Sequence, residues 1–184
     1  GTSLSSIKIP RSVVSFRGNP FAVCFYLKVI DVSENPNFVF VDGVLIDKGK
    51  TQIVYCNPSK SGDYSIPNTV TSICIDAFRG CNTLTSITIP DSVKEIGEGA
   101  FFECFWLNSV RLPNSISVIR NSTFSECTRL SSITIPGSVK EIGTEAFNNC
   151  NLSSITIPES VRKIRGRAFY DCANLRSVAL PGSL

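Results

Sequence analysis

The residues of this chain with the most chemical potential are its eight cysteines. Six of them occupy one place in a repeated sequence pattern: Cys24, Cys81, Cys104, Cys127, Cys150 and Cys172. Thiols can act as nucleophiles, bind metal ions or form disulfides. However, no two cysteines have the C-x-x-C spacing of a zinc site, and the chain contains no histidine. Cys-His and Ser-His-Asp catalysis are therefore excluded, and we expect no metal or other cofactor.

Other catalytic signals are also missing from the sequence. The chain contains neither the G-x-x-x-x-G-K-[ST] loop that holds nucleotide phosphates nor the G-x-G-x-x-G motif of dinucleotide-binding folds. A carboxylate pair or a Ser-Lys dyad is chemically possible, but nothing in the sequence points to one. The sequence therefore favours a protein that is not an enzyme.

The cysteines are positioned by a sequence repeat. The phrase LSSITIP occurs at Leu130–Pro136 and Leu152–Pro158, and LTSITIP occurs at Leu84–Pro90. The prolines that end this phrase and its looser copies stand at 67, 90, 113, 136, 158 and 181, so the interval is 23 residues, with one of 22. We count each coil from its proline, and place n is the nth residue after it. Apolar residues fill places 3, 6, 10, 11, 14, 17, 20 and 22 of nearly every coil, and the six cysteines fill place 14.

A unit of 23 residues cannot bury its own apolar side chains, but stacked copies share one continuous core, as in a solenoid. The alternating L-x-x-I-x-I phrase predicts one half-buried strand per coil in a parallel sheet, which the following proline ends. The segments SVKEI (92–96) and EGAFFEC (98–104) predict a second short strand and a tight helical turn. The cysteines of place 14 are expected to be buried and reduced, because identical side chains in parallel coils point the same way.

The segment LTSITIPDSVKEIGEGAFFEC, residues 84–104, resembles the BspA-like (Treponema-type) leucine-rich repeat, and the resemblance covers nearly the whole chain. Its departures are few: Thr123 and Pro20 replace the alanine of place 10, and one residue is missing before Leu152. The resemblance implies a right-handed leucine-rich-repeat superhelix with a parallel β-sheet on its concave face, short strands and helical turns. It also implies a secreted or surface-attached bacterial protein that binds other proteins, including host matrix proteins, without catalysis.

The same pattern begins at Pro10, so we expect one domain over residues 1–184, with about six coils and an insertion at 33–66. Because both ends stop within the pattern, the chain is expected to be a fragment of a longer protein. Within the insertion, Phe38–Val41 and Val44–Ile46 flank an Asp-Gly pair that suits a two-residue hairpin turn. The insertion is either a binding protrusion or a flap that extends the sheet, and its apolar strands favour the flap.

The coil at residues 90–112 departs from the repeat because it carries large aromatic residues where other coils have mostly small or polar ones. Arg111 is the exception in the middle of a sheet face that otherwise carries serine and threonine. The candidate partner-binding residues are Trp106, Phe102, Phe105, Arg111, Thr88 and Thr134. Since Trp and Arg are enriched in interface hot spots, we expect Trp106, Phe102 and Arg111 to form the centre of a protein-binding patch. The alternative, favoured by the cost of exposing three large apolar residues, is that these rings cover the neighbouring coil or the insertion.

Composition limits the classes of function that remain. Hydrophobic residues make up 42% of the chain and charged residues 18%, which is typical of a globular protein. A net charge of +3 is too small for a nucleic-acid-binding protein, and no apolar run is long enough for membrane insertion. We expect an extracellular or cell-surface module. Its partner is expected to be an extracellular protein, a class that includes host matrix proteins, or a glycan. The alternative is an accessory or spacer module of a larger secreted protein, which would carry no patch that departs from the repeat.

Overall fold

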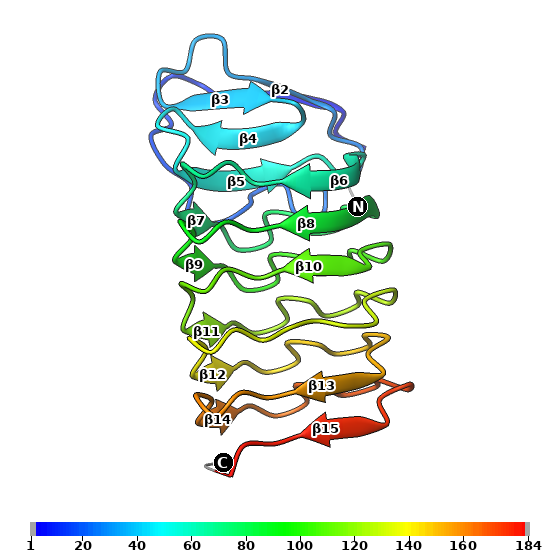
Figure 1. Ribbon diagram of the computed structural model, residues 1–184. Coiled ribbons are helices and arrows are strands. Elements are labelled where there is room, and N and C mark those ends of the chain that lie inside the picture. Colours follow the sequence, from blue (N-terminus) through cyan, green and yellow to red (C-terminus); the bar gives the residue numbers. More distant parts are fainter. Residues whose placement is uncertain (1–2, 183–184) are drawn as a thin grey trace.

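The computed structural model describes residues 3–182, which form a stack of coils with two columns of strands (Figure 1). Side A consists of the strands of the L-x-x-I-x-I phrase and one strand of the insertion: β6 (Ser61–Ser65), β8 (Thr83–Thr88), β10 (Ser109–Arg111), β13 (Ser154–Thr156) and β15 (Ser177–Ala179). Side B consists of shorter strands: β7 (Ser72–Ile73), β9 (Glu95–Ile96), β11 (Val118–Ile119), β12 (Glu141–Ile142) and β14 (Lys163–Ile164). Places 8 to 16 of each coil form a third side, the turn side.

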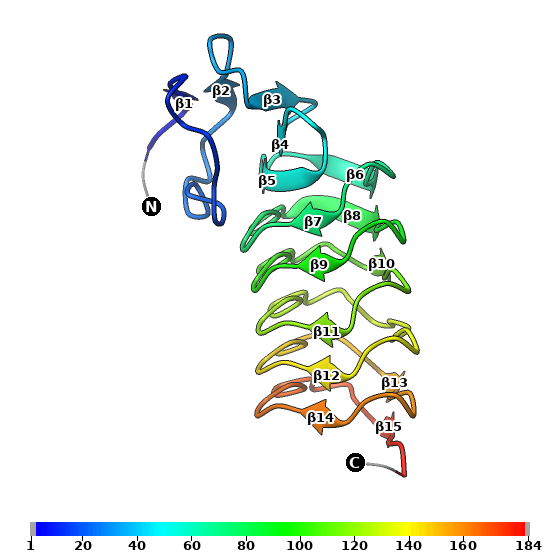
Figure 2. The same cartoon turned by 90° about the vertical axis from the view of Figure 1, so that its left-hand side faces the viewer.

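Equivalent residues of successive coils are stacked in register. On side A, Val110 lies opposite Ile87, and on side B, Ile142 lies between Ile119 and Ile164. All these pairings are parallel, as the repeat predicts, so each coil buries its apolar places against the same places of its neighbour. The stack has little curvature in either view (Figures 1 and 2), and side A is therefore not the pronounced concave face that we expected.

Side A is interrupted at residues 131–136, which form no strand, so that β6, β8 and β10 are separated from β13 and β15. The strand predicted at Leu130–Pro136 is therefore wrong. The interruption lies next to the coil that lacks one residue before Leu152. The short coil keeps its side B ladder with both neighbours, and on side A it pairs only with the coil that follows it.

The turn side contains no helix among residues 3–182, so the predicted helical turns are not confirmed. The chain instead makes consecutive tight turns, with bonds such as Cys104 N–H to Phe101 O (3.3 Å) and Leu107 N–H to Cys104 O (3.0 Å). The residues of places 9 and 13 have left-handed backbone angles: Asp76, Gly99, Ser122, Glu145 and Arg167, and Gly80, Glu103, Glu126, Asn149 and Asp171. Two left-handed residues in each turn region prevent a right-handed helix from propagating.

The core contains a stack of phenylalanine rings from place 11 of successive coils. Its members are Phe78, Phe101, Phe124, Phe147 and Phe169. Successive ring centroids are 5.1, 5.4, 5.5 and 5.5 Å apart, within the range of stacked aromatic pairs. The first four rings are completely buried. Each coil thus adds one ring to a shared core that no coil could form alone.

All eight cysteines are buried and free of disulfides, which confirms the prediction for the six cysteines of place 14. Thiols donate to carbonyl oxygens of the preceding coil: Cys104 Sγ to Phe78 O (3.1 Å), Cys127 Sγ to Phe101 O (3.2 Å) and Cys150 Sγ to Phe124 O (3.1 Å). Burial raises the pKa of the Cys127 thiol well above its usual range. These thiols are therefore protonated at neutral pH and are poor nucleophiles.

The insertion extends both strand columns. Strands β3 (Phe38–Val41) and β4 (Val44–Asp47) are antiparallel, and the two residues that join them, Asp42 and Gly43, have φ angles of 50° and 77°. Strand β5 (Gln52–Cys56) pairs with β4 on one edge and with β7 on the other. Since β6 pairs with β8, the insertion supplies an irregular coil that continues the sheets, as the flap interpretation predicts.

The first coil does not stack on the others along its whole length. Strands β1 (Ser6–Lys8) and β2 (Val29–Asp31) form a separate sheet, which lies beside β3 and β4 of the insertion (Figure 2). This coil meets the coil of Pro67 at a bridge between Gly18 and Ile75, where Asn19 N–H donates to Ile75 O (2.9 Å). Strand β5 occupies the rest of the surface that the first coil would cover in a regular stack, so the insertion displaces this coil.

Candidate functional site

The turn that follows Cys104 presents Phe105 and Trp106 to solvent. Leu107 is completely buried, and its N–H donates to Cys104 O (3.0 Å), so the two residues between them form the outer corner of the turn. Phe105 is 38% exposed and Trp106 is 49% exposed. The interpretation in which these rings are mostly buried therefore fails for Trp106, whereas Phe105 is more buried than exposed.

Both neighbouring coils hold this corner in place. The guanidinium carbon of Arg129, the equivalent of Trp106 in the next coil, lies 3.6 Å from the centroid of the Trp106 ring. A cation–π contact at an exposed position contributes about 0.5–1 kcal/mol. Thr128 Oγ1 donates to Phe105 O (3.3 Å), and Asn82 Oδ1 accepts from Phe105 N–H (3.5 Å). The two exposed rings are therefore part of an ordered surface.

Phe102 belongs to a different part of the turn side. Its ring is half-buried, and the guanidinium carbon of Arg79 lies 4.7 Å from its centroid. Arg79 Nε also lies 3.5 Å from the carboxylate of Glu103. No ring contact within residues 3–182 joins Phe102 to Phe105 or Trp106, so the structure does not bring the three aromatic candidates into one cluster.

Arg111 and the two threonine candidates lie away from Trp106. Arg111 ends β10, five residues after Trp106, and extended chain of that length spans roughly 16 Å. Its Nη1 donates to Ile89 O (3.2 Å), and in the ladder it pairs with Thr88, which is exposed on side A. Thr134 is exposed in the interruption of side A. The patch of Trp106, Phe102 and Arg111 and the binding role of each of these residues stay predictions.

A second exposed aromatic pair was missed in the sequence. Phe25 and Tyr26 of the first coil occupy the same two places as Phe105 and Trp106, in the motif C-F-Y-L against C-F-W-L. They are 41% and 67% exposed, and Phe25 packs against Gly80 of the coil between the two pairs. The shared motif is a signal that the sequence contains. The contact with Gly80 therefore brings the pair of the displaced first coil against the turn side, one coil away from Phe105 and Trp106.

Neither a metal-binding group nor a membrane-spanning helix is found in the described part of the chain. The described part of the chain, residues 3–182, holds no group of three or more Cys, Asp or Glu residues that could bind a metal ion. Within the same residues, no helix has the length and apolar character needed to cross a membrane. The stacked coils with one shared core define the class of the molecule, a repeat protein.

The chain belongs to the family of the BspA type leucine-rich repeat region. Six copies of this repeat match residues 1–40 and 52–176, which places the break in the pattern at the insertion. No protein of curated function matches the chain.

Three solved structures illustrate the relationship. A leucine-rich cell surface protein of Faecalibacterium prausnitzii is 34% identical with a TM-score of 0.88, and the match covers 97% of this chain and 48% of that one. A leucine-rich repeat protein of Bacteroides ovatus is 36% identical with a TM-score of 0.66, over 78% of this chain and 39% of that one. The leucine-rich repeat protein of T. pallidum is 32% identical with a TM-score of 0.66, over 78% and 68%. The chain thus spans about half the length of the first of these relatives and less than half the length of the second.

Proposed function

We propose that this chain is a non-catalytic recognition module that acts outside the cell or at its surface, and that it binds a protein at the corner formed by Phe105 and Trp106. The observation that carries the proposal is the exposure of these two rings at places that other coils of the stack fill with residues such as Asn82, Thr83 and Thr128. The stack does not need aromatic side chains there, and Trp and Arg are both enriched among the hot spots of protein interfaces.

The proposed partner is an extracellular protein, with host matrix proteins as the first class to test, and a glycan as the alternative ligand. The description of the Faecalibacterium prausnitzii relative as a cell surface protein supports the location. The small net charge of +3 argues against nucleic acid. We further propose that residues 1–184 act as one domain, in which the first coil contributes Phe25 and Tyr26 to the same edge.

The second candidate function is that of a spacer or accessory module in a larger secreted protein. It is favoured by the regular stack of coils, in which most outward places carry small polar residues. A spacer has no reason to keep two exposed aromatic pairs, and this is the observation that favours recognition.

The test is binding of the chain to a panel of immobilised, purified extracellular matrix proteins, measured by biolayer interferometry. The Trp106→Ala variant should bind roughly 30-fold more weakly, because truncation of a hot-spot residue costs about 2 kcal/mol or more. Tyr170→Ala is the matched control, since Tyr170 is also exposed (61%) and lies beside an arginine, Arg167, at 5.6 Å. Equal loss in both variants, or none in Trp106→Ala, would place the site elsewhere. Failure of the wild-type chain to bind any panel member would favour the spacer.

A further inference from the structure

A groove follows the edge where side B meets the turn side, at place 7 of the coils. This place is occupied by Arg17, Cys74, Gly97, Arg120, Gly143 and Arg165. Side chains and bare backbone therefore alternate from Gly97 to Arg165 along the stack. The edge is also far from Trp106, which stands at place 16, at the opposite end of the turn side.

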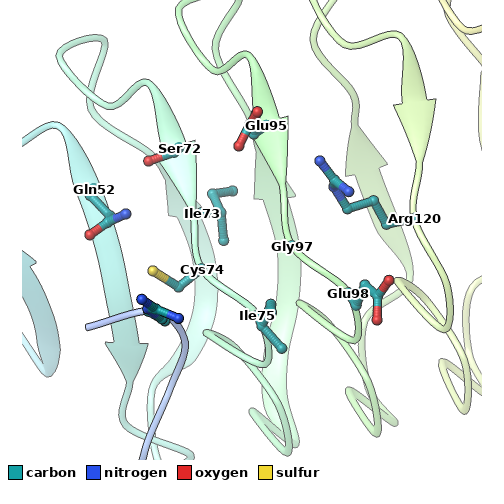
Figure 3. A pocket seen from close by; sticks show the side chains of 10 residues that line it. Gln52, Ser72, Ile73, Cys74, Ile75, Glu95, Gly97, Glu98 and Arg120 are labelled. Carbon is teal, nitrogen blue, oxygen red and sulfur yellow. The ribbon is translucent and has the colours of Figure 1, made fainter. Parts of the chain in front are cut away.

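The first hollow of this groove lies between Arg17 and Arg120 and has a volume of about 310 Å³. Its polar lining residues are Arg17, Gln52, Ser72, Glu95, Glu98 and Arg120. Figure 3 shows Arg120, Glu95 and Glu98 around the bare backbone of Gly97, with Ile75 beside them. Ile75 is 46% exposed and gives the floor an apolar surface. The volume is at the small end of the range for small-molecule sites.

The second hollow, of about 320 Å³, lies between Arg120 and Arg165 over Gly143. It repeats the lining chemistry of the first, with Glu98 and Glu141 as its carboxylates and the neighbouring amide of Asn121. Arg120 is shared by both hollows. The floors, Gly97 and Gly143, are two coils apart, which corresponds to about 10 Å along the stack.

The two glycines keep the floor of the groove bare. A Cβ on Gly97 would lie 2.4 Å from Ile75 N, and a Cβ on Gly143 would lie 2.6 Å from Arg120 C. Backbone atoms of the preceding coil would have to move to admit any side chain at either place. The hollows are therefore a fixed consequence of how tightly these coils pack.

The groove contains equal numbers of positive and negative side chains, and only some of them form ion pairs or hydrogen bonds with one another. Each hollow has two guanidinium groups and two carboxylates among its lining residues. Arg165 pairs with Glu141 (2.5 Å), whereas Arg17 and Arg120 are exposed and have no carboxylate within 4.0 Å in residues 3–182. Asn121 Nδ2 donates to Glu98 Oε1 (3.1 Å), which orients that carboxylate. Arg120 therefore offers free donors beside fixed acceptors.

We propose that this groove binds a linear, uncharged saccharide chain that runs along the stack. An anionic ligand would meet the carboxylates of each hollow, and a cationic ligand would meet the arginines. A hydroxyl group both donates and accepts, so neighbouring sugar hydroxyls match guanidinium and carboxylate groups at once. The exposed face of Ile75 suits the C–H surface of a sugar ring. The site is separate from the proposed protein site at Trp106 and does not depend on it.

The test is affinity electrophoresis and calorimetry of the chain with soluble xylan, mannan and β-1,3-glucan oligosaccharides, with chondroitin sulfate as the anionic comparison. At least one neutral saccharide should bind, and Arg120→Ala should weaken that binding by at least about tenfold, because Arg120 serves both hollows through charged hydrogen bonds. The control variant Arg176→Ala, which removes an exposed arginine on side A, should leave the binding unchanged. Arg120 is exposed, so its loss should leave the unfolding transition unchanged, which circular dichroism will check.

Three results would overturn the proposal. The first is that no neutral saccharide of the three classes binds. The second is that only chondroitin sulfate binds, with an affinity that falls steeply with salt, which would indicate an anion site. The third is that Arg120→Ala binds neutral saccharide as tightly as the wild-type chain.

Discussion

The ring of Phe25 lies so close to Gly80 that a Cβ on Gly80 would come within 2.7 Å of Phe25 Cε1. Gly80 stands at place 13, where the other coils have Glu103, Glu126, Asn149 and Asp171 with the same left-handed backbone. Because these residues adopt the left-handed angle without being glycine, the φ angle of 70° alone does not require glycine at Gly80. The close approach of the Phe25 ring does require it. This contact fixes the displaced first coil against the turn side.

Gly80→Ala should release the first coil from the stack. The new methyl group collides with Phe25, and the left-handed angle adds about 1–2 kcal/mol of strain. The readout is hydrogen exchange of the Asn19 amide, which donates to Ile75 O in the native protein and should exchange at least about tenfold faster. Glu103→Ala, at the same place of the next coil, has no such ring above it and should leave the Asn19 amide protected. Unchanged exchange in Gly80→Ala would mean that Phe25 does not hold the coil.

Phe124→Ala should lower the free energy of unfolding by about 3–5 kcal/mol, because it removes a completely buried ring from the middle of the stack. Phe169 stacks only on Phe147 and is half-buried, so Phe169→Ala should cost clearly less. Urea denaturation of the two variants measures the difference. Equal losses would contradict a core shared along the whole ring stack.

Ser122→Gly should stabilise the chain by about 0.5–1 kcal/mol, whereas Ser122→Val should destabilise it by about 1–2 kcal/mol or more. Ser122 has a φ angle of 51°, which glycine adopts without strain and a β-branched residue does not. Melting temperatures of the pair test the sign. If both variants shifted the melting temperature in the same direction, the left-handed φ angle of Ser122 would not be the cause of the change in stability.

The chain should lose stability at alkaline pH. Burial raises the pKa of the Cys74 thiol from 9.0 to about 11, and that of Tyr64 from 10.0 to about 12. The native state therefore holds these protons more tightly than the unfolded chain, so their contribution is complete below pH 9 and is lost as pH rises through 11 and beyond. Urea unfolding at about pH 8 and about pH 10.5 should show the decline, which Cys74→Ala should make shallower. An identical slope in that variant would rule out the thiol as a cause.

The strands and the core places could be predicted from the sequence because both follow from one local pattern. Val110 pairs with Ile87 and Ile142 with Ile119, as the spacing of the prolines requires. The absence of helices on the turn side could not be predicted from the sequence. An A-F-x-x-C segment has helical spacing, and the sequence does not indicate that residues such as Glu103 and Glu126 have a left-handed φ angle. Only the turn geometry of neighbouring coils imposes that angle.

The displaced first coil and the composition of the candidate site depend on contacts between distant residues. Pairing of β5 with β7 decides where the first coil lies, and no local pattern encodes that choice. Arg111 and Trp106 share a coil and lie a strand-length apart, as the sequence predicts, and their joint role stays a prediction. Arg129, which contacts Trp106, lies 23 positions further along the chain and is a neighbour only because the coils are stacked.

The stacked rings and thiol bonds described above have an evolutionary consequence. Each coil presents to its successor the same groups that its predecessor presents to it, so a whole coil could be duplicated or lost without altering the kind of contact on either side. The loss of a single residue before Leu152, by contrast, coincides with a broken sheet. Gain or loss of a coil therefore changes the length of the molecule in steps of about 4.8 Å. Each step shifts the surface groups on one side of the change relative to those on the other side, while the contacts of the interior stay the same.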